Sequence, residues 1–281
     1  MKALTFLAKR FVAGEESSEA VAVGKRLQSK GIRATFDKLG EDVHDPAAAE
    51  RASGAAKELL RLIPSEVQRN VSIKMSSMGQ TISRDLCLKN TASILDVAKE
   101  VGGFVRLDME GSKLTQDTIE IFHELRKGYD NVGIVLQAYL HRTLDDVRAA
   151  VERGDSVRLC KGAYKEPPDV ALQEMPEIRK NFREAAHLLL QRGRFPAIAT
   201  HDEELVGETL EFTRQEGIEP SRFEFQMLYG LRPRKWSQLV ADGYNMRVYV
   251  PYGTHWVPYF YRRLRERREN IFFVLRSLLG G

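Results

Sequence analysis

The sequence predicts an α/β fold of the (βα)8 barrel type, because eight strand-like segments alternate with helix-like segments along most of its 281 residues. The strand-like segments recur about every 30 residues, which is the length of one βα unit. Most of them are short apolar runs with β-branched residues, as expected for parallel strands that are buried on both faces. This pattern leaves a doubly wound open sheet as the structural alternative.

The chain begins with a stretch, 1–31, that we expect to be helical and to precede the barrel. Within it, Ser17 is expected to cap a helix that Gly31 ends. The barrel is expected over 33–281, with strands at 33–39, 71–77, 104–110, 132–139, 156–162, 197–201, 223–228 and 246–250. No linker, low-complexity segment or shift in composition divides the chain, so we expect one domain over 1–281.

Helix-start signals follow most of the predicted strands. Asp45 and Pro46 predict the start of a helix that ends near Ile63, because Asp accepts hydrogen bonds from the first turn and Pro suits the first helical position. Thr115 and Thr143 are expected to cap two further helices. Other helices are expected at 85–101, from Asp202 onward, and near 176–191 and 233–242.

The composition is that of an ordinary globular protein, with 43% hydrophobic and 29% charged residues. The net charge of +4 is too small to indicate a nucleic-acid partner by itself. The start of the chain lacks the features of a signal peptide, and no apolar run is long enough for a transmembrane helix. Cys87 and Cys160 lie far apart in the sequence, so neither a disulfide framework nor a zinc site is expected. We expect a reducing, cytoplasmic location.

Polar and charged residues stand at the ends of the predicted strands, where barrels of this type gather their chemistry. They are Lys74, Asp108, Gln137, Arg158, Lys161, Thr200, His201, Gln226 and Tyr249. Any one of them, taken alone, is explained by a structural ion pair or hydrogen bond. Because successive strands all end in this way, we expect one large polar site at the mouth of the barrel.

Several common ligand-binding motifs are missing from the sequence. There is no GxGxxG dinucleotide motif, no P-loop and no HExxH motif. Asp108 and Glu110 are candidate metal ligands, but we expect only one of them to face inward, so no metal is predicted. The basic residues suit an anionic substrate, an anionic cofactor or both, and they are Lys74, Arg158, Lys161, Arg262 and Arg263.

A basic helix is predicted near the end of the chain. In it, Tyr259, Arg262, Arg263 and Glu266 are spaced so that they share one helix face. Two adjacent guanidinium groups beside a tyrosine suit a carboxylate or a phosphate, because the planar guanidinium binds an oxyanion in bidentate fashion. The segment alone leaves a solvated basic helix as the alternative.

Seven sequence blocks lie at the predicted strand ends and in this last helix, namely 72–76, 106–110, 136–139, 158–164, 199–202, 223–230 and 259–266. In this order they strongly resemble the bacterial monofunctional proline dehydrogenases, and the similarity extends from about residue 10 to 275. The RLxKGAY block at 158–164 and the YxxRRxxE block at 259–266 are the most specific. The resemblance implies a distorted (βα)8 barrel that binds FAD at its C-terminal mouth and carries its last helix over that mouth.

The resemblance also implies roles for individual residues. The implied proline-binding positions are Lys74, Tyr164, Leu228, Tyr249, Tyr259, Arg262 and Arg263. The implied FAD-contacting positions are Gln137, Arg158, Lys161, Thr200, His201, Gln226 and Glu266. As catalytic residues, Arg158 would lie near the reactive flavin edge, Lys74 would bind the substrate carboxylate with the arginine pair, and Asp108 would order the pocket. The spacing leaves open whether Tyr249 or Tyr252 lines the proline pocket.

The implied reaction is the FAD-dependent oxidation of L-proline to 1-pyrroline-5-carboxylate by hydride transfer to flavin N5. It is the first step of proline degradation towards glutamate. The electrons would pass on to a quinone, which allows peripheral contact with the inner face of the plasma membrane. No nucleic-acid partner is implied.

Two other functions remain open from the residues alone. Lys74 or Lys161 at a strand end would allow a Schiff-base enzyme, either an aldolase or a pyridoxal-phosphate enzyme. The basic run 262–268 would allow a protein that binds nucleic acid or a membrane surface, although Glu266 interrupts that run.

Overall fold

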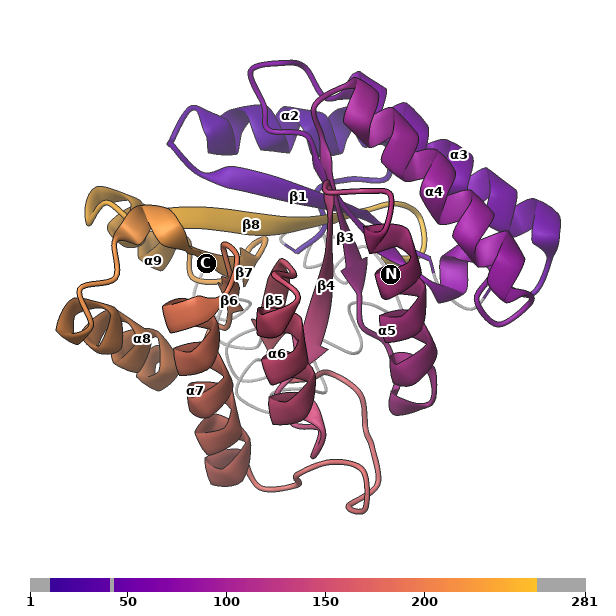
Figure 1. Cartoon of the computed structure of the whole chain (residues 1–281). Coiled ribbons are helices and arrows are strands. Elements are labelled where there is room, and N and C mark those ends of the chain that lie inside the picture. Colours follow the sequence, from indigo (N-terminus) through magenta and orange to yellow (C-terminus); the bar gives the residue numbers. More distant parts are fainter. Residues whose placement is uncertain (1–10, 41–42, 257–281) are drawn as a thin grey trace, which may run out of the picture.

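The computed structural model describes residues 11–40 and 43–256, in which eight parallel strands close into one barrel (Figure 1). The strands are β1 (Arg33–Lys38), β2 (Asn70–Lys74), β3 (Phe104–Asp108), β4 (Val132–Gln137), β5 (Val157–Cys160), β6 (Ala197–Ala199), β7 (Glu224–Leu228) and β8 (Asn245–Tyr252). Each strand pairs with the next, and β8 pairs with β1 from Arg33 with Arg247 to Lys38 with Tyr252. The predicted barrel is confirmed, and the closed ring excludes an open sheet.

Helices surround the barrel on the outside (Figure 1). Those described are α2 (Ser17–Gln28), α3 (Pro46–Leu62), α4 (Arg84–Glu100), α5 (Ser112–Arg126), α6 (Thr143–Glu152), α7 (Met175–Arg192), α8 (Glu203–Gln215) and α9 (Pro233–Ala241), with the short 3₁₀ helices η1 (Ser76–Met78) and η2 (Pro220–Arg222). Helices α3 to α9 follow β1 to β7 in turn. Within the described ranges, no helix is both long and apolar enough to span a membrane. The helix expected over the barrel mouth lies outside these ranges.

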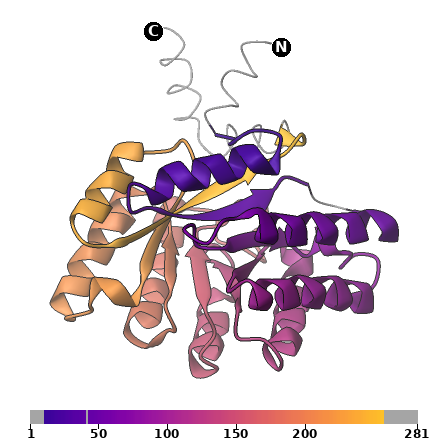
Figure 2. The ribbon, with the colours of Figure 1, turned by 90° about the horizontal axis from the view of Figure 1, so that it is seen from above.

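Helix α2 lies on the outside of the barrel and packs against β1 and β8. Figure 2 shows α2 lying along these two strands. Its apolar face buries Ala20, Val23 and Leu27. Gly24 allows close approach to β1, because a Cβ at this position would lie 2.5 Å from the ring of Phe36. The predicted N-terminal helix therefore covers the two strands at which the barrel closes.

Apolar side chains fill the layer between strands and helices, whereas the interior of the barrel is polar. Val105 and Leu107 of β3 are fully buried in that layer, as is Phe122 of α5. Inside the barrel, by contrast, the hydroxyl oxygens of Thr35 and Ser72 lie 3.2 Å apart. Burial of each large apolar side chain contributes about 1.5–3 kcal/mol. The outer layer therefore supplies the hydrophobic stabilisation, and the interior is left for polar groups.

Some of the predicted helix starts are confirmed, and others are wrong. Helix α2 begins at Ser17 rather than after it, and its N-cap is Glu16, which forms a capping box with Glu19. The expected helix starts at Asp45 and Asp202 are confirmed. Each of these two side chains accepts a hydrogen bond of 3.2 Å from the backbone N–H two residues later.

The predicted caps at Thr115 and Thr143 are wrong. Helix α5 begins earlier, at Ser112, because Glu166 from a distant loop accepts hydrogen bonds of 2.6 Å from both the backbone N–H and the hydroxyl of Ser112. Thr143 is the first residue of α6, and its hydroxyl donates to the carbonyl oxygen of Gln137 at 2.5 Å. A cap supplied by a residue 54 positions away leaves no signal in the local sequence.

Several strands end earlier than predicted. For example, β2 ends at Lys74 and β5 at Cys160. Beyond these residues the chain leaves the strand ladder and forms loops around the carboxyl end of the barrel. After η1, Gly79 has a φ of +97°, a conformation in which glycine is favoured, and it turns the chain back toward α4. These loops carry part of the site described next.

Candidate active site

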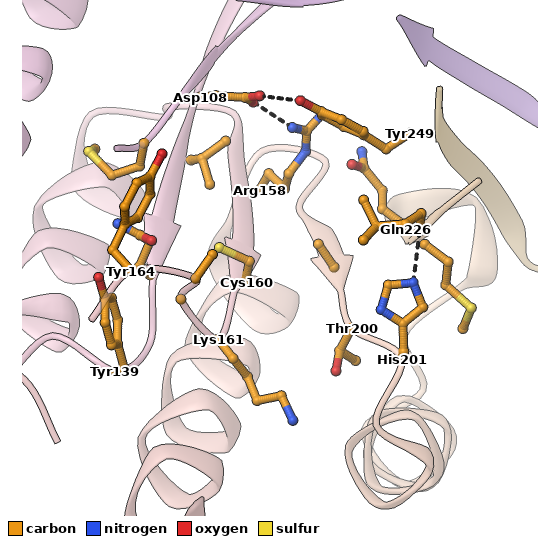
Figure 3. A pocket seen from close by; sticks show the side chains of 18 of the residues that line it. Asp108, Tyr139, Arg158, Cys160, Lys161, Tyr164, Thr200, His201, Gln226 and Tyr249 are labelled. Carbon is orange, nitrogen blue, oxygen red and sulfur yellow. Dashed lines mark hydrogen bonds and ion pairs between the residues drawn. The ribbon is translucent and has the colours of Figure 1, made fainter. Parts of the chain in front are cut away.

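A cavity of about 330 Å³ lies at the carboxyl ends of the strands (Figure 3). Every predicted site residue within the described chain lines it, namely Lys74, Asp108, Gln137, Arg158, Lys161, Tyr164, Thr200, His201, Gln226, Leu228 and Tyr249. The barrel therefore brings together side chains that are widely separated in the sequence. The other predicted residues, Tyr259, Arg262, Arg263 and Glu266, lie outside the described residues.

Asp108 at the end of β3 links β5 and β8 through its contacts with Arg158 and Tyr249 (Figure 3). One carboxylate oxygen accepts a hydrogen bond from Arg158 Nη1 at 2.8 Å, and the other accepts one from the Tyr249 hydroxyl at 2.8 Å. Arg158 also donates through Nη2 to the Ser72 hydroxyl at 3.1 Å. Because Arg158 is buried, these contacts fix its guanidinium group before any ligand binds.

Lys74 at the end of β2 forms a buried ion pair with Asp37 of β1. Its ammonium nitrogen lies 2.9 Å from both carboxylate oxygens of Asp37. Burial opposes the charge on Lys74, but the carboxylates of Asp37 and Asp108 outweigh burial and raise the pKa of the lysine. A lysine held in its protonated form is a poor nucleophile, so this pair argues against a Schiff-base enzyme acting through Lys74.

Of the two candidate tyrosines in β8, only Tyr249 lines the cavity. Tyr252 is buried elsewhere, beside a separate cavity between β1, β2 and α3. The two residues are three positions apart, so they face opposite sides of the strand. This alternation places Tyr249, and not Tyr252, at the cavity.

Lys161 belongs to a cluster of charges at the start of α8. Asp202, the N-cap of that helix, accepts from Lys161 Nζ at 2.7 Å and from Arg179 Nε at 2.9 Å. Burial acts against ionisation of Asp202, but the bonds from Arg179 and Lys161 prevail and hold its pKa at about 2. Of this cluster only Lys161 lines the cavity, so one cation lies there beside the N-terminus of α8.

Backbone contacts orient three more of the predicted residues. The Nε2 atom of His201 accepts a hydrogen bond from the backbone N–H of Leu228 at 2.8 Å, so this nitrogen carries no proton here (Figure 3). The hydroxyl of Thr200 accepts from the N–H of Asp202 at 3.1 Å. Gln137 donates through Nε2 to the carbonyl oxygen of Glu110 at 2.9 Å. Each side chain is thus held by a backbone group of its own or a neighbouring βα unit.

The expectation that only one of Asp108 and Glu110 faces inward is wrong, because both line the cavity. Residues two positions apart lie on the same face of a strand. Glu110 accepts hydrogen bonds from the backbone N–H and the hydroxyl of Ser76, at 2.9 and 2.6 Å, and so ties η1 to the end of β3. In the part of the chain that the structure describes, no group of three or more His, Cys, Asp or Glu residues could hold a metal ion.

Several lining residues were not predicted, namely Asp37, Met109, Tyr139, Cys160, Met175 and Ile178. Asp37 had a signal in the sequence, because it is a carboxylate inside a predicted strand. The close contact of Gly162 with Tyr139 had none. A Cβ at Gly162 would lie 2.2 Å from that ring, and the φ of Gly162 is +121°. Only glycine fits this position, so it allows the loop after β5 to pack against Tyr139.

Three residues that line the cavity each have a buried polar atom with no hydrogen-bond partner among the described residues. These atoms are Arg158 Nε, a donor, Gln226 Oε1, an acceptor, and the Tyr139 hydroxyl oxygen, which can donate or accept. Buried polar atoms of this kind are costly unless they are satisfied. A bound group that offers both an acceptor and a donor would satisfy them.

A cavity with ordered cations at the carboxyl mouth of a (βα)8 barrel defines a barrel enzyme whose site suits a small anionic ligand. A family model described as "Proline dehydrogenase" matches residues 20–276. The chain belongs to that family, as its sequence blocks indicated.

Curated relatives cover almost the whole chain. Proline dehydrogenase 1 of Bacillus subtilis is 38% identical over 273 residues, which make up 97% of this chain and 90% of that protein. Proline dehydrogenase of Deinococcus radiodurans is 39% identical over an alignment of 284 positions, which covers 98% of this chain and 91% of that protein.

Solved structures of larger proteins contain the same fold. Proline utilization A (PutA) from Bdellovibrio bacteriovorus, inactivated by N-propargylglycine, has a TM-score of 0.84 and 29% identity, covering 92% of this chain and 32% of that chain. A PutA with proline bound in remote sites has a TM-score of 0.74 and 27% identity, covering 91% of this chain and 30% of that chain. The chain therefore spans about a third of the length of these PutA chains.

Proposed function

We propose that this chain is a proline dehydrogenase, an oxidoreductase that converts L-proline to 1-pyrroline-5-carboxylate as the first step of proline degradation towards glutamate. Family membership and the full-length relatives of that name support the proposal. The observation that carries it is the convergence of the predicted strand-end residues on a single cavity. We further propose that 1–281 forms one domain.

FAD is the cofactor that we propose for the mouth of the barrel. The residues present fit a flavin, because the unsatisfied donor Arg158 Nε and acceptor Gln226 Oε1 suit the polar edge of an isoalloxazine ring. We expect the flavin to be held by Gln137, Arg158, Lys161, Thr200, His201 and Gln226, together with Glu266. When bound, the flavin supplies the acceptor at N5 for the hydride that leaves the proline ring carbon beside nitrogen.

The protein residues bind and orient the substrate in this proposal. Lys74, kept protonated by Asp37, supplies positive charge for the carboxylate of proline. Tyr164, Leu228 and Tyr249 offer apolar and aromatic surface that suits the proline ring. Asp108 fixes both Arg158 and Tyr249 and so orders the pocket. Tyr259 would add to the ring contacts, and Arg262 and Arg263 would complete the carboxylate clamp.

We propose a quinone as the electron acceptor and a cytoplasmic location, with peripheral contact at the inner face of the plasma membrane. Re-oxidation of the proline-reduced protein by a soluble quinone, compared with air, tests the acceptor. Co-sedimentation with anionic vesicles before and after reduction tests the membrane contact. Faster re-oxidation by air than by quinone would contradict the proposed acceptor.

Anaerobic titration of the FAD-loaded protein with L-proline tests the proposed reaction. We expect the oxidised flavin absorbance to bleach at stoichiometric amounts of L-proline, with 1-pyrroline-5-carboxylate as the product. An equal concentration of D-proline serves as the control for the ring and carboxylate alone. A flavin that stays oxidised in the presence of L-proline would rule the proposal out.

A further inference from the structure

The side-chain amide of Gln226 is held in one orientation by a hydrogen bond to Glu224. Gln226 lies in β7, its side chain is buried, and it lines the cavity between His201 and Tyr249 in the view of Figure 3. Its Nε2 donates to Glu224 Oε1 at 2.5 Å. Its Oε1 is buried and has no hydrogen-bond partner within the described chain. The NH₂ group of the amide is thus bound to Glu224, and the oxygen is available to a ligand.

Glu224 accepts this bond as a carboxylate. Arg247 of β8 donates to both of its oxygens, at 2.8 and 3.0 Å, and Arg33 of β1 lies 3.6 Å away. Burial opposes the charge on Glu224, but Arg247 outweighs burial and lowers its pKa. An ionised carboxylate can only accept hydrogen bonds, so it can face only the NH₂ end of the neighbouring amide. Glu224 itself is fully enclosed and does not line the cavity.

We propose that Glu224 is a positioning residue that turns the amide of Gln226 so that its oxygen, and not its NH₂ group, is offered to the bound group. The site would then select a ligand that donates a hydrogen bond at this point. Resting on the proposed function, we assign that donor to the imide N–H of the flavin ring. Oxidised isoalloxazine carries one such N–H, flanked by two carbonyl groups.

The arrangement explains why a charged network lies beneath the cavity. With a neutral, hydroxyl-bearing or amide neighbour in place of Glu224, the amide of Gln226 would be free to present either end. A wrongly turned amide would place a donor against the donor of the ring and leave both unsatisfied. Arg247 therefore acts on the ligand indirectly, by keeping Glu224 ionised.

The test uses the protein loaded with FAD that is labelled with ¹⁵N at the imide nitrogen. Proton exchange at that nitrogen is measured by NMR, and the dissociation constant of FAD is measured by fluorescence quenching. In the unaltered protein we expect a slowly exchanging imide proton. In Gln226→Met and in Glu224→Gln we expect exchange at least about ten-fold faster and FAD binding about ten-fold weaker, the loss of one hydrogen bond.

Asp155→Asn is the matched control. Asp155 is also a buried carboxylate held by arginines, with Arg153 Nε at 3.1 Å and Arg126 Nε at 3.6 Å, but it does not line the cavity. We expect imide exchange and FAD affinity to stay unchanged in this variant.

The outcomes separate this inference from the proposed function. If Glu224→Gln keeps the slow exchange and the affinity of the unaltered protein, Glu224 does not orient the amide and the inference is overturned. If Gln226→Met keeps the slow exchange and the affinity, the imide N–H donates to a group other than Gln226, and the inference is overturned as well. Failure of the unaltered apoprotein to bind FAD would contradict the proposed function instead. Should Glu224→Gln not fold, Glu224→Asp carries the same expectation, because the shorter side chain keeps the charge but falls short of Gln226.

Discussion

At the scale of single residues, the charges around the cavity are held in pairs that reach from strand to strand. Lys74 pairs with Asp37 and Arg158 with Asp108, at distances of 2.9 and 2.8 Å. Removing one partner of a buried pair costs about 3–5 kcal/mol, because the other charge is left uncompensated. These pairs therefore fix the cations of the site in place, and they explain why so many charged residues can stand at strand ends.

Tyr249→Phe should lower kcat/KM for proline by about ten-fold or more. The change removes the hydroxyl that donates to Asp108 at 2.8 Å, and a hydrogen bond to a charged group contributes about 1.5–3 kcal/mol. Tyr252→Phe is the matched control, since Tyr252 lies outside the cavity, and it should leave steady-state kinetics unchanged. Equal effects of the two substitutions would contradict the assignment of Tyr249 to the site.

Arg262→Met or Arg263→Met should raise KM for proline much more than it alters FAD content. Both residues lie outside the described chain, so this prediction rests on the sequence blocks. Loss of one partner of a desolvated charge pair is worth about 2–5 kcal/mol, or about 30- to several-thousand-fold. Arg268→Met, expected at the solvated face, is the control. An unchanged KM for proline in both variants would contradict the assignment of Arg262 and Arg263 to the carboxylate of proline.

At the scale of secondary structure elements, the loop between β5 and α7 builds one wall of the cavity. It carries Lys161, Gly162 and Tyr164, all of which line the cavity. Further along the loop, Glu166 binds the N-terminus of α5 through Ser112. The loop therefore depends on contacts with two other βα units, and its shape is set by them rather than by its own sequence.

Gly162→Ala should destabilise the protein and disturb the cavity wall together. The new Cβ would lie 2.2 Å from the Tyr139 ring, and the φ of +121° would add backbone strain. Gly154→Ala is the control, because Gly154 also has a positive φ, +67°, but open space where its Cβ would lie among the described residues. We expect thermal melting to show a loss of about 1 kcal/mol for Gly154→Ala and a larger loss for Gly162→Ala. Only Gly162→Ala should lower kcat/KM.

At the scale of the whole molecule, ion pairs between elements make stability depend on pH. The bonds from Arg179 and Lys161 hold the pKa of Asp202 at about 2, below its ordinary value of 3.8. In the unfolded chain Asp202 therefore binds its proton more readily than in the folded protein. Its contribution to stability is fully present above the ordinary value and is lost as the pH falls toward about 2.

Asp202→Asn should therefore lose up to about 2 kcal/mol of unfolding free energy at neutral pH. Its melting temperature should also vary less than that of the unaltered protein between about pH 4 and about pH 2. Asp45→Asn is the control, because it replaces an exposed helix cap by another good cap residue. Parallel pH profiles for Asp202→Asn and the unaltered protein would show that Asp202 does not supply this dependence.

Much of the fold and part of the site follow from local patterns. The alternation of strands and helices predicted the barrel, and Asp45 and Asp202 marked helix starts. Caps that depend on distant residues could not be predicted, as with Glu166 and the start of α5. The packing of α2 on β1 could not be predicted either, because the close contact of Gly24 with Phe36 depends on the tertiary structure.

By itself the sequence determined the barrel, the family and the side chains that stand at the strand ends, because periodicity and motif spacing are local properties of the chain. The tertiary structure alone decided which partner each charge takes. Lys74 pairs with a residue 37 positions away and Arg158 with one 50 positions away. These partners are set by the register of neighbouring strands and by closure of the barrel. Neither the register nor the closure can be predicted from the residue spacing within a single segment.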